Sequence, residues 1–179
     1  MTAPKALVKG FDKNIESYKE TKKYPMELNR FIHENFSVVM SFAYSYRPLA
    51  ELIDNKFLGY NKYLEKALFE VGEEKANRAI IELAILIRIL DDEERIGNFD
   101  KQCGTNISCG SLILKDDKVI ELTFREFSNK IIHARTFKWD FSASEPRLIC
   151  HSRDDDSDRW IRAEVDLVGL AAFCGRLIS

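Results

Sequence analysis

The sequence lacks the features that would assign it to a membrane, secreted or strongly charged class of protein. No apolar run approaches the roughly 20 residues needed to cross a bilayer, and residues 1–14 lack the continuous apolar segment of a secretory signal. Twenty-seven Lys and Arg residues against 29 Asp and Glu residues leave a formal charge of -2, which gives no global basic field for nucleic acid or an anionic membrane. We therefore expect a cytoplasmic protein without membrane contact, in which any nucleic-acid site is local.

Cysteine is also scarce. Four cysteines are too few and too irregularly spaced for the disulfide framework of a small secreted domain, so reduced thiols are expected. Cys103, Cys109, Cys150 and His151 would form a soft-metal site only if the loop between the first two folded over the later strand. Their spacing lacks the two-residue separation of a zinc knuckle, and buried or free thiols are the favoured interpretation.

The aspartates at Asp154, Asp156 and Asp158 begin like a calcium-binding loop. Arg159 then occupies the place where the sharp turn needs Gly, and Val165 the place where a bidentate Glu is needed. We interpret this segment as a solvated acidic turn and expect no metal. The chain also has no GxxxxGK[ST] run and no GxGxxG after a strand, so no cofactor is predicted.

A chain of 179 residues, 45% hydrophobic, is long enough for one well-buried core and short for two. Residues 1–24 are rich in lysine and poor in apolar residues, which indicates a basic N-terminal arm. The remainder, residues 25–179, is predicted to form a single domain.

The order of the predicted elements favours an α+β fold. Helices are predicted from Pro25 to an interruption at Pro48, over residues 49–57, over residues 60–71 ending at Gly72, and over residues 73–92. Strands are predicted over residues 111–114, 118–122, 136–141, 147–151 and 160–165, with a C-terminal helix over residues 167–178. The plan is an N-terminal helical layer (about 25–95) packed on a mostly antiparallel sheet (about 110–165) that carries an inserted helix.

The helix predicted over residues 73–92 is apolar on most sides, so it should be central and covered by its neighbours. Its acidic end, Asp91 to Glu94, lies where the helix dipole disfavours anions. We interpret that end as frayed and solvated, rather than as the site of a cation or a basic partner.

The inserted helix carries the sharpest functional pattern. Thr123 and Glu126 have the spacing of a capping box, which predicts a helix start there and a helix over about 123–134. Arg125, Asn129 and His133 then follow one another at i, i+4 and i+8 along its polar side. A cation, an amide and an imidazole in that arrangement suit phosphate binding and proton transfer, although any amphipathic helix has a solvated polar face.

The segment Asn129 to His133 resembles the end of the motif of HEPN-type ribonucleases. The resemblance implies metal-independent RNA cleavage, in which an Arg holds the phosphate and the His handles the 2′-hydroxyl proton. Asn129 and His133 match that motif, whereas Ser128 stands in place of its Arg and the nearest upstream Arg is Arg125. Members of that family are also mostly all-helical, unlike the fold predicted here.

Two function classes follow. The first is a binding or regulatory protein of unknown protein or small-molecule ligand, with self-association as a homodimer as one arrangement. Its expected surface is aromatic, formed by Tyr44, Tyr46, Phe137 and Trp139. The alternative is a metal-independent endoribonuclease with His133 as general acid/base, Arg125 or Arg135 on the phosphate, and Asn129 orienting the RNA.

Overall fold

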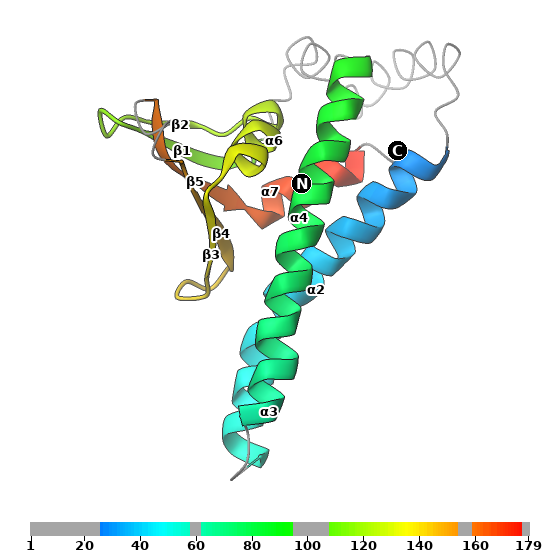
Figure 1. The fold of residues 1–179 in the computed structure, drawn as a ribbon, viewed down its shortest axis with the longest axis vertical. Helices are drawn as coiled ribbons and strands as arrows, with labels where there is room; N and C mark the ends of the chain where they lie inside the picture. The colour runs from blue at the N-terminus through cyan, green and yellow to red at the C-terminus, as the bar shows by residue number, and fades with distance from the viewer. Residues whose placement is uncertain (1–25, 58–61, 95–107, 154–158, 177–179) are drawn as a thin grey trace, which may run out of the picture.

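In a computed structural model, residues 26–57, 62–94, 108–153 and 159–176 of the chain are described. The helical part consists of α2 (Met26–Lys56), α3 (Lys62–Glu65), a π-helical segment η1 (Lys66–Glu70) and α4 (Val71–Glu94). It is followed by β1 (Gly110–Leu114), β2 (Val119–Glu121), α6 (Phe124–His133), β3 (Thr136–Asp140), β4 (Arg147–His151), β5 (Trp160–Asp166) and α7 (Leu167–Arg176). The predicted α+β plan is confirmed (Figure 1). The predictions for residues 1–24, for Cys103 and for residues 154–158 lie outside the described residues.

The first helix does not end at proline, so the predicted break is wrong. α2 runs through Pro48 as one helix of 31 residues. A proline inside a helix removes one backbone donor and costs about 3 kcal/mol. Beyond Pro48 the helix still buries Ile53, which is 5% exposed, and this packing offsets part of that cost.

The predicted helix end at Gly72 is also wrong, because this glycine lies inside α4. A Cβ atom built at Gly72 would lie 3.1 Å from Cδ2 of Phe42 on α2. Glycine therefore serves a close approach between α4 and α2 rather than a helix end. The two helices form a long antiparallel hairpin, and its lower part extends beyond the sheet (Figure 1).

The five strands form one antiparallel sheet in the order β2-β1-β5-β4-β3. The predicted hairpin is confirmed as β1 and β2, joined by a turn in which Asp117 has a φ of 60°. One sheet face carries the buried row Leu112, Ala163 and Cys150, which are paired across β1, β5 and β4. Helices α6 and α7 lie on this side, between the sheet and the helical hairpin (Figure 1).

The inserted helix forms where the capping box predicts. Thr123 is the N-cap of α6, and its Oγ1 accepts a hydrogen bond of 3.3 Å from the backbone N–H of Glu126. Phe127 and Ile131 point into the core and are fully buried. The helix is short, at 10 residues, so the cap and this burial together hold it in place.

The predicted aromatic surface does not form. Its four candidate residues were Tyr44, Tyr46, Phe137 and Trp139. Tyr46 stacks on Phe141 with ring centroids 3.8 Å apart. Trp139 is buried, and its Nε1 donates a hydrogen bond of 2.8 Å to Asn77. Only Tyr44 of the four is a strongly exposed side chain, because Tyr46 and Trp139 join the helical hairpin to the sheet region and Phe137 packs against the core.

The expectation that α4 is covered by its neighbours is wrong for one face. Ile81, Ile85 and Ile89 are 37%, 44% and 41% exposed, while Ile80, Leu83 and Ile87 on the opposite side are fully buried. Among the described helices, none combines the length and apolar character needed to cross a membrane.

Candidate functional site

Arg125, Asn129 and His133 form a polar ridge along α6. The first of them contacts α4 rather than solvent. The guanidinium of Arg125 donates to the carboxylate of Asp91, and its Nη1 lies 3.2 Å from Oδ1 of Asp92. Asp91 is 3% exposed. The hydrogen bond to Asp91 is the main reason that the pKa of Arg125 is raised, with Asp92 adding to it. The charge of Arg125 is thus matched by carboxylates of the neighbouring helix.

This contact corrects the interpretation of the acidic end of α4 as frayed. Asp91 is buried, and Asp92 is held by Arg88 on the same helix, with Nε 3.0 Å from Oδ2. The hydrogen bond from Arg88 is the largest cause of the lowered pKa of Asp92. A basic partner for these carboxylates comes from α6 of the same chain.

Asn129, the second ridge residue, lies at the border between α4 and a pocket. Its Oδ1 accepts a hydrogen bond of 2.6 Å from Nη1 of Arg88. The amide nitrogen of Asn129 is a donor that this bond does not use. The Arg88 contact therefore orients Asn129 and leaves its donor for another group.

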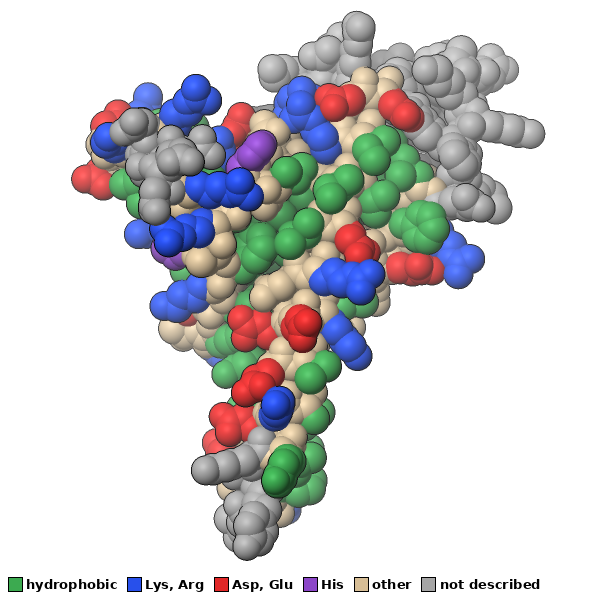
Figure 2. Space-filling model, viewed as in Figure 1, with side chains coloured by type: hydrophobic (Ala, Val, Ile, Leu, Met, Phe, Trp, Pro, Cys, Tyr) green, Lys and Arg blue, Asp and Glu red, His purple; other side chains and the backbone are tan. Residues whose placement is uncertain are grey.

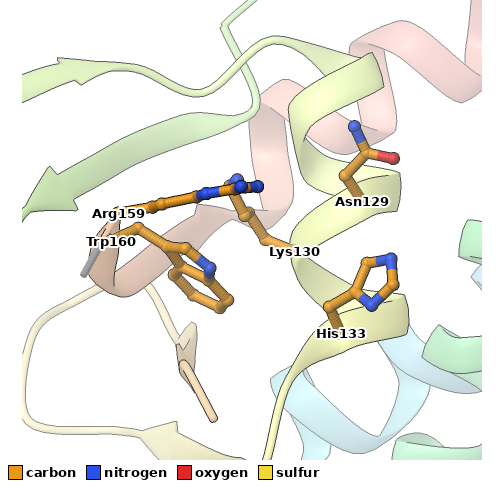
Figure 3. Close-up of a pocket in the computed structure, with 5 residues that line it drawn as sticks. All are labelled: Asn129, Lys130, His133, Arg159 and Trp160. Atoms are coloured by element: carbon orange, nitrogen blue, oxygen red, sulfur yellow. The ribbon is translucent and has the colours of Figure 1, made fainter. Parts of the chain in front are cut away.

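His133, the third ridge residue, lines a pocket of about 290 Å³ together with Asn129, Lys130, Arg159 and Trp160 (Figure 3). Asn129, Lys130 and His133 come from α6, whereas Trp160 begins β5 and Arg159 precedes it. Figure 3 shows the side chains of Lys130 and Arg159 extending toward one another above the Trp160 ring.

Trp160 forms the floor of this pocket because β5 is irregular at its start. Leu114 pairs with Trp160 and Ile113 with Arg162, which leaves Ile161 as a bulge. The bulge turns Trp160 to the same side as Ala163, whereas strict alternation along the strand would place Trp160 with Arg162 and Glu164. Trp160 is 3% exposed.

Lys130 is placed by two neighbours. Its Nζ lies 5.2 Å from the centroid of the Trp160 ring, a cation–π distance. The same Nζ lies 3.1 Å from Oε2 of Glu126, one helical turn earlier. An ammonium has three donors, so this pair leaves Lys130 able to bind a further acceptor.

The pocket has the character of an anion site. Lys130 and Arg159 supply two positive charges, His133 supplies an imidazole and Asn129 an amide donor. Among the described residues that line the pocket there is no carboxylate. Such a set binds oxyanions, because charge-assisted hydrogen bonds to a phosphate or carboxylate are the stronger ones.

Two of the three ridge residues predicted from the sequence therefore meet in one pocket, and the third does not. Arg135, the other candidate for binding the phosphate, is not among the residues that line the pocket. Its backbone N–H donates a hydrogen bond of 2.9 Å to the carbonyl of His151. Sequence reasoning missed Lys130, Arg159 and Trp160. Lys130 precedes His133 by one helical turn and could have been found by spacing, whereas Arg159 and Trp160 need the tertiary structure.

Within the described ranges, no group of three or more His, Cys, Asp or Glu residues is arranged to hold a metal. Cys109, Cys150 and Cys174 are buried. Burial raises the pKa of Cys174 to about 12 and that of Cys150 further. These three thiols thus have the character of core residues.

The HEPN resemblance of Asn129 and His133 stays a prediction. Comparisons with protein-family models, with curated proteins and with solved structures find no match to this chain.

Proposed function

We propose that this protein is a binding module for a phosphate-bearing ligand, held in the pocket between α6 and the start of β5. The observation that carries the proposal is the convergence of Lys130, Arg159 and His133 on one pocket. The cytoplasmic location predicted from the sequence stays a prediction.

The local electrostatics explain why more than one cation is needed. Lys130 and His133 lie in the last turn of α6, where the helix dipole favours cations and opposes a bound anion. Hydrogen bonds to charged groups contribute about 1.5–3 kcal/mol each. Two such bonds, from Lys130 and Arg159, outweigh a dipole term of about 0.3–1 kcal/mol.

The pocket also limits the size of the ligand. Its volume of about 290 Å³ lies just below the roughly 300–1,000 Å³ found for ligand sites. A phosphate group with one attached ring or sugar fits that space. The buried ring of Trp160 gives the site an apolar floor for the remainder of such a ligand.

Binding is favoured over catalysis because the pocket offers one group for proton transfer. Among the five lining side chains, His133 is the one of a residue type that commonly serves as both general acid and general base. Acid and base steps of a phosphodiester cleavage are most readily divided between two groups. A binding role needs only the cations and the amide.

Trp160 provides a direct signal for the test. The chain has two tryptophans, and Trp139→Phe leaves Trp160 as the only indole. We expect saturable quenching or enhancement of its fluorescence when pyrophosphate is added at constant ionic strength. Circular dichroism would first confirm that this variant is folded, since Trp139 donates to Asn77.

Substitution then assigns the binding to the pocket. Arg159→Gln and Lys130→Gln should each raise the Kd at least tenfold, since about 1.4 kcal/mol corresponds to a factor of ten. Lys138→Gln, which removes an exposed cation of β3 outside the pocket lining, is the matched control and should leave the Kd unchanged. Absence of saturation, or an equal effect of Lys138→Gln, would refute the proposal.

A second candidate, the metal-independent endoribonuclease, is favoured by the position of His133. Its imidazole is exposed and shares the pocket with Asn129 and two cations. In this arrangement Lys130 or Arg159 would hold the phosphate, the role that the sequence prediction gave to Arg125 or Arg135. RNA cleavage in the presence of EDTA should then be lost in His133→Ala and kept in His151→Ala, a matched histidine on β4.

A further inference from the structure

One face of α4 is apolar and uncovered. Ile81, Ile85 and Ile89 recur at i, i+4 and i+8, and each is more than one third exposed. On the neighbouring helix α2, Phe31 and Val38 are 47% and 41% exposed. Figure 2 shows hydrophobic side chains gathered over α4 and α2 on the face turned to the viewer, with charged side chains around them.

The exposed stripe of α4 is symmetric in sequence about Ile85. Ile81 lies four residues before Ile85, and Ile89 lies four residues after it. Three residues away stand opposite charges, Glu82 and Arg88. Seven residues away stand opposite charges again, Arg78 and Asp92.

We infer that the occupant of this face is a second copy of the same chain, with the two α4 helices antiparallel across a two-fold axis at Ile85. In an antiparallel pair, a residue n positions before the axis faces the residue n positions after it in the partner. Ile85 then meets Ile85 of the partner subunit, and Ile81 meets Ile89 of the partner subunit. The three isoleucines of each copy form one continuous apolar seam.

The charges around the seam select this arrangement. Arg78 and Asp92 lie close to the isoleucine stripe of α4, so across the axis Arg78 faces Asp92 of the partner subunit. A parallel arrangement would instead place Arg78 against its own copy and Asp92 against its own copy, and both pairs would repel. The four rim residues also sum to zero charge, which gives no attraction to a strongly acidic or basic partner.

The pairs within one chain do not oppose this contact. Arg78 lies 2.8 Å from Glu82, and Arg88 lies 3.0 Å from Asp92, each one helical turn apart on α4. Such exposed pairs contribute little by themselves. Approach of the partner extends each pair into an interhelical network, as charged residues do on the flanks of helical bundles.

The first test is the mass in solution. Sedimentation velocity of the full chain should give twice the 20.7 kDa of one chain. Ile85→Glu places two carboxylates together on the axis and should return the mass to that of one chain. Ile161→Glu, at an isoleucine 38% exposed on β5, is the matched control and should leave the mass of the dimer. A monomeric wild type, or a dimer that persists in Ile85→Glu, would overturn the inference.

Cysteine cross-linking tests the antiparallel symmetry without relying on a destabilising variant. In a Cys103→Ser background, Ile85→Cys should form a disulfide-linked dimer by itself under mild oxidation, because that position lies on the axis. Ile81→Cys and Ile89→Cys should each fail alone and cross-link when mixed. If Ile81→Cys alone cross-linked at least as efficiently as its mixture with Ile89→Cys, the contact would be parallel. That result would overturn the proposed two-fold arrangement.

Discussion

The two ends of the polar ridge on α6 carry similar residue types and have different environments. At the first turn, Arg125 meets the carboxylates of Asp91 and Asp92 on α4. At the last turn, His133 lies beside Lys130 and Arg159 in a pocket. The charge of Arg125 is therefore matched by carboxylates of α4, whereas the other end carries Arg159 and a Lys130 that is paired only with Glu126 of its own helix.

Helix dipoles explain why the first end is neutralised. Anions are disfavoured at the C-terminus of α4, and a cation is disfavoured at the N-terminus of α6. Asp91 and Arg125 each occupy the unfavourable end of their own helix. Their contact satisfies both charges at once. A polar residue on an amphipathic ridge can thus belong to the fold or to a site, and its neighbours decide which.

The largest expected effect is the loss of folding stability when Arg125 is removed. Arg125→Ala leaves the buried carboxylate of Asp91 without its guanidinium, and we expect about 2–3 kcal/mol less stability. This lies below the 3–5 kcal/mol of a fully buried pair, because Arg125 is 46% exposed. Urea unfolding measures it, with His133→Ala as the control at the other end. A comparable loss in His133→Ala would remove the distinction between the two ends.

Asn129 stands between the two environments, so its substitution sharpens the comparison. Asn129→Ala removes the acceptor of Arg88 and should cost about 1.5 kcal/mol in urea unfolding. Asn129→Asp keeps an acceptor for Arg88 but adds a carboxylate to the pocket. This variant should retain stability and lose pyrophosphate binding by at least tenfold. Equal binding in wild type and Asn129→Asp would place the ligand away from Asn129.

The sequence was sufficient to predict the elements whose signals are local. The Thr123 and Glu126 spacing located the start of α6, and the strand pattern located the hairpin of β1 and β2. The corrections involve contacts between distant residues. Gly72 continues a helix because Phe42 lies against it, and Arg125 finds Asp91 34 positions earlier in the chain.

The candidate site shows the same division. Asn129 and His133 could be paired by helical spacing, which is a property of a single element. Trp160 enters the pocket through a bulge that depends on the register between β1 and β5. The sequence pattern also could not predict the exposed face of α4. An apolar stripe has the same pattern whether it packs against its own chain or against a partner.

A smaller loss of stability is expected when the N-cap of α6 is removed. Thr123→Ala removes the side-chain acceptor of the Glu126 N–H and should cost about 1 kcal/mol, with Thr123→Ser restoring most of it. Because the cap lies at the carboxylate-matched end, the Kd for pyrophosphate of the folded protein should not change. Weaker pyrophosphate binding in folded Thr123→Ala would mean that the pocket depends on the whole of α6.

The smallest effect is a pH dependence confined to the carboxylate-matched end. The pKa of Asp92 is lowered in the folded state, chiefly by the hydrogen bond from Arg88. A lowered folded-state pKa contributes stability that is present above the ordinary value of 3.8 and is lost as the pH falls through the folded-state value. The difference in unfolding free energy between wild type and Asp92→Asn should therefore shrink when urea unfolding is moved from pH above that value to pH below it. Glu93→Gln controls for the loss of one negative charge from the same turn of α4. A wild-type advantage over Asp92→Asn that stayed constant on acidification would show that Asp92 acts there by shape rather than by charge, and the contrast between the two ends of the ridge would then rest on Asp91 alone.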